Sequence, residues 1–253
     1  MQELQGRVAV VTGAASGIGL GIASAFANEG MRLVLADLDR ARLAAEAARL
    51  TEAGHEVETV VTDVGDPDAV AALGAATMAR FGVVHVVCNN AGVVTAGKTW
   101  EIPLTEWERV LRINLMGVIH GVRTFVPLLL QSGEEGHVVN VASMAAVMAV
   151  PGIAPYSVAK HGVLALSETM HMELSAAGAP IGVTVVMPGR VRTRLGLAPD
   201  AAERPATPDP DIIEPAVVGA QVVEAIRANR LHLFTHPDRL PDVARRFALT
   251  TDD

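Results

Sequence analysis

Short apolar runs rich in β-branched residues recur along the chain and alternate with longer, alanine-rich stretches. The apolar runs predict strands over Arg7–Thr12, Met31–Ala36, Glu56–Thr62, Val83–Asn89, His137–Ala142, Gly182–Met187 and Leu231–Thr235. The stretches between them have helical spacing and predict helices such as Arg40–Ala53, Pro67–Phe81, Pro103–Gln131 and Val158–Ala177. Strands that alternate with helices of about 10–20 residues indicate βαβ units and a parallel sheet.

The predicted strands are nearly continuous apolar runs, which is typical of a parallel sheet covered by helices on both faces. The 253 residues contain no linker and no long segment of different amino-acid composition. This length suits one large α/β domain. We therefore predict an α/β fold: a single Rossmann-like, doubly wound parallel sheet of about seven strands. One domain is expected over residues 1–253.

One segment, residues 190–215, departs from this alternation. It contains five prolines: Pro199, Pro205, Pro208, Pro210 and Pro215. Such a segment cannot be one regular helix, and it is too long for an ordinary connection. A substrate loop or lid is one interpretation, and a surface insertion without a function is the other.

Charge and composition narrow the classes of function. A net charge of −8 and a pI near 5.5 argue against nucleic-acid or anionic-membrane partners. The uncharged run Gly136–Ala159 is long enough to span a bilayer, but Pro151 and Pro155 break any single helix there, so we expect a buried strand, a loop and a helix start. The lone Cys88 predicts a buried, inert thiol. Residues 1–6 lack the basic start and apolar stretch of a secretory signal, so a cytoplasmic protein is expected.

The first predicted strand leads directly into a glycine-rich turn, Thr12-Gly13-Ala14-Ala15-Ser16-Gly17-Ile18-Gly19. Glycines allow a tight turn and let the backbone approach a pyrophosphate. A helix beginning at about Gly17 would point its free N–H groups and positive dipole end at the phosphates. A crowded corner can use glycine for packing alone, but a strand before the turn and a helix after it favour dinucleotide binding.

An acidic residue stands about 20 residues further on, as this kind of site requires. Asp37 lies at the end of the second predicted strand. A carboxylate there accepts the ribose hydroxyls of NAD and repels the 2′-phosphate of NADP. A simple helix N-cap is the alternative role for Asp37.

Tyr156 is the only tyrosine in the chain, and Lys160, one of two lysines, follows four residues later. Positions i and i+4 share one face of a helix. A unit positive charge ~4 Å away contributes about 4 kcal/mol at an effective dielectric of ~20. That energy would move the phenol pKa from ~10 toward neutrality by up to ~3 units, as a general acid/base needs. The alternative is a partly buried tyrosine beside a lysine whose stem packs on it.

The spacing of Gly13, Gly17 and Gly19 closely resembles that of the short-chain dehydrogenase/reductase family, and the resemblance extends over the whole chain. Asn89-Asn90-Ala91-Gly92 follows the fourth strand as in the family, and Ser143 stands thirteen residues before Tyr156. Three more matches are Asp63-Val64, Asn114 in the long helix, and Pro188-Gly189 followed by Thr193.

The resemblance implies the roles of these residues. Tyr156 would transfer a proton, Ser143 would bind the substrate oxygen, Lys160 would assist Tyr156 and hold the nicotinamide ribose, and Asn114 with water would connect Lys160 to solvent. The implied cofactor-binding residues are Gly13, Ser16, Gly17, Ile18, Gly19, Asp37, Asp63, Val64, Asn90, Ala91, Gly92, Tyr156, Lys160, Val191 and Thr193. The family also implies a homotetramer (or a dimer) that assembles through the long helices Pro103–Gln131 and Val158–Ala177.

Two positions depart from the family pattern, and neither touches the chemistry: His85 replaces a common aspartate and Ala142 a common serine. His120, His161 and His171 lack metal-ligand spacing with cysteines or acids, so no metal site is expected.

The predicted function is hydride transfer between NAD and a secondary alcohol or ketone. An apolar pocket is expected from Met144, Ala145, Val147, Val150 and Met187, and it would suit a hydrophobic substrate. Steroids, aromatic carbinols, alicyclic alcohols and polyketide-like compounds all fit that description, and NAD favours oxidation. An NADPH-preferring carbonyl reductase is the first alternative, although Ser16 and Leu38 are neutral and Arg40 is the only basic candidate nearby. A non-catalytic dinucleotide-binding protein is a second alternative, and an epimerase or dehydratase a third.

Overall fold

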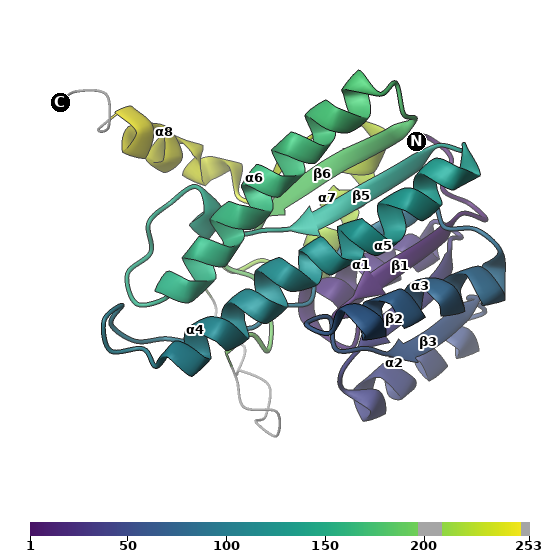
Figure 1. The fold of residues 1–253 in the computed structure, drawn as a ribbon, viewed down its shortest axis with the longest axis horizontal. Coiled ribbons are helices and arrows are strands. Elements are labelled where there is room, and N and C mark those ends of the chain that lie inside the picture. The colour runs from purple at the N-terminus through teal and green to yellow at the C-terminus, as the bar shows by residue number, and fades with distance from the viewer. Residues whose placement is uncertain (197–208, 249–253) are drawn as a thin grey trace.

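The computed structural model describes residues 1–196 and 209–248, and its centre is one seven-stranded sheet (Figure 1). Every neighbouring pair of strands is parallel, and the order is β3-β2-β1-β4-β5-β6-β7. The strands are β1 (Val8–Thr12), β2 (Arg32–Asp37), β3 (Val57–Val61), β4 (Val86–Asn89), β5 (Gly136–Val141), β6 (Ile181–Met187) and β7 (His232–Phe234). This is a Rossmann-like sheet, so the predicted fold class is confirmed.

Helices cover both faces of the sheet. They are α1 (Gly17–Asn28), α2 (Arg40–Glu52), α3 (Pro67–Phe81), α4 (Leu104–Leu111), α5 (Gly117–Ser132), α6 (Ala154–Ala176), α7 (Pro215–Arg227) and α8 (Leu240–Ala248), with short turns η1 (Arg112–Met116), η2 (Met144–Ala146) and η3 (Pro237–Arg239). Successive strand residues point to opposite faces. Val11 packs in the core with α1, α2 and α7, whereas Val10 packs with α3, α5 and α6.

The predicted helix over 103–131 is a continuous helical run with a π-helical turn, η1, in its middle. By length and composition alone, the run Leu104–Ser132 could cross a membrane, and the core helix of a soluble protein meets the same criterion. Here the run packs against α3, β4 and α6. The apolar run Gly136–Ala159, as expected, forms β5, η2 and the start of α6.

All strands of a parallel sheet end at the same edge, and that edge is where ligands bind in open α/β sheets. Residues predicted for the site follow this rule: Gly13 comes directly after β1, Asp37 ends β2, and Asn90 comes directly after β4. Ser143 lies two residues beyond β5.

A chain of buried polar side chains fixes α6 against the sheet. Asn89 Nδ2 in β4 donates to Asn140 Oδ1 in β5 over 2.9 Å, and Asn140 Nδ2 donates to Ser167 Oγ in α6 over 3.0 Å. Ser167 in turn donates to the Val163 carbonyl over 2.7 Å. The backbone of α5 approaches closely at Gly121, where a Cβ would overlap the Asn89 amide. These contacts set how far α6 stands from β5.

Replacing Asn140 with alanine should lower the free energy of unfolding by about 2–4 kcal/mol, because the buried Asn89 and Ser167 both lose a hydrogen-bond partner. Urea unfolding measures this loss. Asn28→Ala, at an exposed position of α1, is the control and should change stability by no more than about 0.5 kcal/mol. Equal effects of the two substitutions would show that the buried chain contributes nothing specific.

Candidate active site

The turn after β1 is built on glycines. Gly13 has a φ of 65° and Gly17 a φ of 54°, a left-handed conformation that side chains with a Cβ rarely adopt. A Cβ on Gly13 would lie 2.8 Å from Asn90 Nδ2, and one on Gly19 would overlap the Gly13 carbonyl. Ser16 precedes α1 in extended conformation, and its hydroxyl does not cap the helix. The N–H groups of the first turn, Ile18 among them, therefore lack intrahelical partners and are open to a phosphate.

The Asn-Asn-Ala-Gly segment after β4 holds this turn in place. Asn90 Nδ2 donates to the Thr12 carbonyl over 2.8 Å. The backbone N–H groups of Asn90 and Ala91 both donate to Thr12 Oγ1, over 3.0 and 3.2 Å. The two segments thus form one surface at the carboxyl ends of β1 and β4.

Asn114 lies in the π-helical turn η1 and is fully buried. Its side chain pairs with the backbone of Val93: Oδ1 accepts from the N–H over 2.8 Å, and Nδ2 donates to the carbonyl over 2.7 Å. A Cβ on Gly92 would lie 3.4 Å from Asn114 Oδ1, so the end of the Asn-Asn-Ala-Gly segment rests on this side chain. Insertion of a π-turn is frequent at functional sites.

Asp37 faces the glycine-rich turn. Its Oδ2 accepts from the Ala15 N–H and its Oδ1 from the Asp39 N–H, each over 3.0 Å. Asp39, not Asp37, caps α2, because its side chain accepts from the Arg42 N–H. The alternative of a helix N-cap therefore does not apply to Asp37. Each of its carboxylate oxygens keeps a lone pair for a further donor such as a ribose hydroxyl.

The next acid, Asp63, is fixed beside the strand ends by two partners. It accepts from Arg112 Nη1 and from the Gly65 N–H, each over 2.9 Å. Burial acts to raise the pKa of Asp63, but the hydrogen bonds from Arg112 and Gly65 outweigh it and hold the pKa below its usual value. The neighbouring Val64 is buried, and its carbonyl lies 2.9 Å from His120 Nδ1.

Tyr156 and Lys160 stand one turn apart in α6, and Ser143 lies before η2. Lys160 is buried, and its Nζ donates to the Val141 carbonyl over 2.7 Å and lies 5.5 Å from the centre of the Tyr156 ring. Ser143 Oγ accepts from the Ala145 N–H over 3.1 Å and is hydrogen-bonded to the Tyr156 side chain. The predicted catalytic group is therefore assembled, with Val141 and Ala145 as backbone partners that the residue pattern did not indicate.

The pKa values correct one expectation. Burial raises the pKa of Tyr156, and the hydrogen bond from Ser143 lowers it only in part. The lowering expected from Lys160 is absent, because the buried amine loses its proton before the phenol titrates. Burial lowers the pKa of Lys160 itself to about 8.

The segment after β6 lies against the glycine-rich turn. Thr193 lies against the turn, since a Cβ on Gly17 would be 3.1 Å from its Cγ2. Val191 pairs with Ile213 in an isolated parallel bridge, which closes the base of the proline-rich segment. The middle of that segment, residues 197–208, lies outside the described residues. Two ion pairs strengthen its base, Arg190–Asp209 and Arg192–Glu214.

Sequence reasoning missed His236, which joins this base to the sheet. The Gly189 N–H donates to His236 Nδ1 over 3.2 Å, and His236 Nε2 lies 3.2 Å from the Asp211 carbonyl. His236 is buried. A Cβ on Gly189 would lie 2.7 Å from His236 Nδ1, so the close approach needs glycine. Only the position of a histidine just after the seventh predicted strand could have signalled this contact.

Of the five residues predicted to line an apolar pocket, four are buried. Met144, Ala145, Val147 and Met187 are at most 8% exposed. Val150 is 40% exposed and lines a cavity.

The predicted inert thiol is confirmed: Cys88 is fully buried, and burial raises its pKa.

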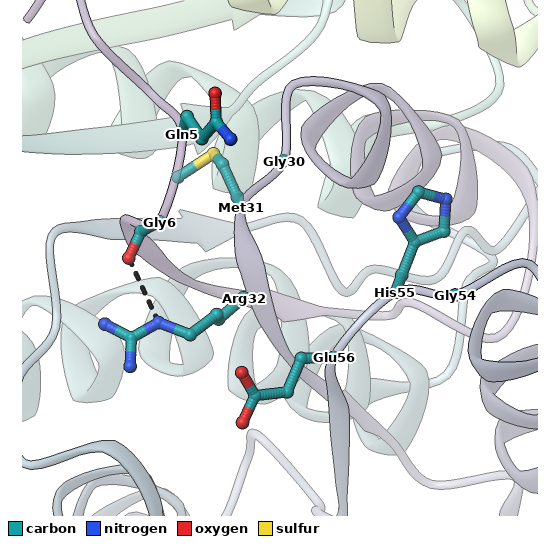
Figure 2. A pocket seen from close by; sticks show the side chains of 8 residues that line it. All are labelled: Gln5, Gly6, Gly30, Met31, Arg32, Gly54, His55 and Glu56. Carbon is teal, nitrogen blue, oxygen red and sulfur yellow. Dashed lines mark hydrogen bonds between the residues drawn. The ribbon is translucent and has the colours of Figure 1, made fainter.

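A different hollow, of about 330 Å³, lies at the opposite edge of the sheet (Figure 2). Gly6, Met31 and Glu56 line it just before β1, β2 and β3 begin, and Arg32 Nε donates to the Gly6 carbonyl across it. It is therefore separate from the site at the carboxyl ends. Within the described ranges, no group of three or more histidine, cysteine or acidic side chains could hold a metal ion.

Comparison with known proteins agrees with this geometry. The family model for short chain dehydrogenases matches residues 7–203. The chain belongs to the short-chain dehydrogenase/reductase family. It is 39% identical over 240 residues to 1-deoxy-11-beta-hydroxypentalenate dehydrogenase of Streptomyces exfoliatus, covering 93% of this chain and 85% of that protein.

Two solved structures show the same fold. One is a short-chain dehydrogenase/reductase from Burkholderia phymatum in complex with NAD, with 37% identity, a TM-score of 0.89 and coverage of 96% of this chain and 94% of that one. Another is a variant of actinorhodin polyketide ketoreductase with NADPH, with 32% identity, a TM-score of 0.81 and coverage of 92% and 97%. The protein is therefore an NAD(P)-dependent oxidoreductase of this family that acts on a small molecule.

Proposed function

We propose that the enzyme transfers hydride between NAD and a secondary alcohol or ketone with a hydrophobic body. The observation that carries this proposal is the assembly of Ser143, Tyr156 and Lys160 at the sheet edge where the glycine-rich turn also lies. The turn fits a dinucleotide, because Gly13 and Gly17 adopt a left-handed backbone and the Ser16 side chain leaves the first N–H groups of α1 uncapped. None of the three reactive side chains is missing, which disfavours a non-catalytic protein.

In oxidation, NAD supplies the hydride acceptor when it is bound. Tyr156 takes the proton of the substrate hydroxyl, and Ser143 donates a hydrogen bond to the same oxygen as charge develops on it. The Ala145 N–H occupies only a lone pair of Ser143 Oγ, so the hydroxyl hydrogen can turn to the substrate oxygen. Lys160 would hold the nicotinamide ribose, and the positive ring of oxidised NAD would favour the phenolate of Tyr156. Asn114, fixed on Val93, with water connects Lys160 to solvent.

Three groups of residues would hold the remainder of NAD. Ser16, Gly17, Ile18 and Gly19 would offer N–H groups to the pyrophosphate. Asp63 and Val64 would contact the adenine, and Ala91, Gly92, Val191 and Thr193 would face the nicotinamide. The described ends of residues 190–215 support the role of this segment as a substrate loop. The Val191–Ile213 bridge anchors them, and Thr193 lies against Gly17 of the glycine-rich turn.

The substrate assignment draws support from one relative. The Streptomyces relative is named for a hydroxypentalenate, a hydroxylated carboxylic acid. A hydroxylated compound of this kind is therefore our first candidate substrate, oxidised in the cytoplasm.

Cofactor choice follows from Asp37, whose carboxylate would stand against a 2′-phosphate of like charge. We expect a higher kcat/KM with NAD than with NADP, and Asp37→Ala should narrow the difference. Steady-state kinetics with both cofactors measure this. Equal or better kcat/KM with NADP would favour the carbonyl-reductase alternative, in which the exposed Arg40 binds the 2′-phosphate.

Tyr156→Phe should reduce kcat by about 10²–10⁴-fold, the usual value of general acid/base assistance. NAD affinity, measured by calorimetry, should stay close to that of the wild type, since the ring is kept. Lys160→Arg keeps the charge but puts a broad fork into a buried site built for a compact ammonium, so activity should also fall. If Tyr156→Phe oxidised the substrate at the wild-type rate, Tyr156 would not be the general acid/base.

We further propose a homotetramer, or a dimer, formed through α5 and α6. Large apolar side chains remain exposed on these helices, Leu130 at 48% and Met172 at 62%. Light scattering at micromolar concentration should show the oligomer, and charged substitutions at both positions should dissociate it. A wild-type monomer would contradict this assembly.

A further inference from the structure

The residues that follow β6 and β7 meet at the edge of the sheet where the cofactor site lies. β6 and β7 are parallel neighbours, with Met187 paired to Phe234, so both chains leave the sheet at its carboxyl edge. His236, two residues beyond β7, is buried there against Gly189, which is two residues beyond β6. The histidine therefore stands beside the segment that leads into the proposed nicotinamide site.

The hydrogen bonds of His236 fix the tautomer of its ring. The Asp211 carbonyl can only accept, and it lies 3.2 Å from Nε2, so Nε2 carries the proton. In the neutral ring Nδ1 is then an acceptor, and the Gly189 N–H donates to it over 3.2 Å. The Thr235 hydroxyl, 2.8 Å away, donates to the same nitrogen. The two ring nitrogens therefore hold two different segments of the chain.

These two segments are the two ends of the proline-rich stretch, and they also pair with each other. The Ile213 N–H donates to a carbonyl of residues 190–192 over 3.1 Å, and the Ile213 carbonyl accepts from an N–H of the same residues over 3.0 Å. His236 adds a third link, between Gly189 and Asp211. The imidazole thus ties both ends of the stretch to the end of β7.

Loss of the imidazole would affect the two ends unequally. Asp211 would keep a second anchor, because its carboxylate accepts from Arg239 Nη2 over 2.6 Å. The Gly189 N–H would be left with the Thr235 hydroxyl, 3.3 Å away, and that hydroxyl would itself have lost the acceptor of its hydrogen. The position of Gly189 therefore depends more strongly on His236 than that of Asp211 does.

Gly189 leads into the residues proposed to face the nicotinamide. Val191 and Thr193 stand two and four residues further along the chain, and Thr193 lies against the glycine-rich turn. The turn itself is held from another side, since Asn90 Nδ2 donates to the Thr12 carbonyl over 2.8 Å. A shift of Gly189 would move the nicotinamide end of the site and leave the pyrophosphate and adenine ends in place.

We propose that His236 is a positioning residue that sets the place of the nicotinamide through Gly189. It keeps Val191 and Thr193 where they meet the nicotinamide, and the rate of hydride transfer is sensitive to displacements of about 1 Å. This inference rests on the proposed function, which places Val191 and Thr193 at the nicotinamide. A role in stability alone is the competing account, and it predicts an equal loss of affinity for every part of the cofactor.

Two conservative substitutions separate the two hydrogen bonds. In His236→Asn the side-chain oxygen lies near the position of Nδ1 and can accept from Gly189. In His236→Gln the amide reaches the position of Nε2 and can donate to Asp211. His236→Ala removes both hydrogen bonds. His232→Ala, at an exposed histidine of the same strand, β7, is the control.

The measurement compares NADH with ADP-ribose, which lacks the nicotinamide, by calorimetry on the 253-residue chain. His236→Ala and His236→Gln should weaken NADH binding by about two- to tenfold, because a positioning contact can contribute no more than its own hydrogen bond. Their affinity for ADP-ribose should equal that of the wild type. His236→Asn and His232→Ala should keep both affinities. With a secondary alcohol as substrate, kcat should fall in His236→Gln and recover in His236→Asn.

Equal weakening of NADH and ADP-ribose in His236→Gln would overturn the proposal, because the histidine would then serve the fold as a whole. Unchanged NADH affinity in His236→Gln, or a failure of His236→Asn to restore that affinity, would overturn it too. If His236→Ala does not fold, the comparison of the other two variants decides alone.

The binding comparison needs no substrate, so its outcome is distinct from that of the proposed reaction. A wild type that oxidises no secondary alcohol would defeat the proposed reaction and leave the binding result standing. If NADPH proves to be the preferred cofactor, it replaces NADH in the same comparison.

Discussion

The hydrogen bond from the Lys160 ammonium to the Val141 carbonyl is the contact on which the site depends. It places a positive charge inside the protein, at the junction of α6 and β5, where the Val141 carbonyl is its one hydrogen-bond acceptor within residues 1–196 and 209–248. Burying an ammonium is costly, and the pKa of about 8 expresses that cost. The lysine nevertheless remains largely protonated at pH 7.

The buried polar chain next to this contact maintains it. Asn140 directly precedes Val141 in β5, and its bond to Ser167 holds α6 at the distance from which Lys160 reaches the carbonyl. The same helix carries Tyr156 to Ser143. A few buried polar groups at the sheet–helix junction thus determine the relative positions of Ser143, Tyr156 and Lys160.

Much of this arrangement could be predicted from the sequence. The alternation of apolar runs and helices predicts the parallel sheet. A parallel sheet puts Gly13, Asp37 and Ser143 at one edge, whatever the conformation of its loops. Contacts between backbone and side chain could not be predicted, because the spacing of residues in the sequence does not give the distances between their atoms in the fold. The clamp of His236 on Gly189 and the capping of α2 by Asp39 in place of Asp37 are of this kind. The approach of Arg246 to His161 depends likewise on where the last helix lies.

The pKa of Tyr156 shows the same limit. Spacing in the sequence places a lysine near the phenol but does not show the direction of its ammonium or the burial of both groups. In the structure burial dominates, so the phenol needs a further positive charge to work near neutrality. The oxidised nicotinamide ring would supply that charge, which links the ionisation of Tyr156 to the binding of NAD.

Because Tyr156 is the only tyrosine, the ultraviolet absorbance of phenolate reports on this group alone. A pH titration of that absorbance with and without NAD tests the link directly. Without NAD the phenol should titrate above its ordinary value of ~10, and saturating NAD should lower its pKa by about 1–3 units. Identical titration curves with and without NAD would contradict the account.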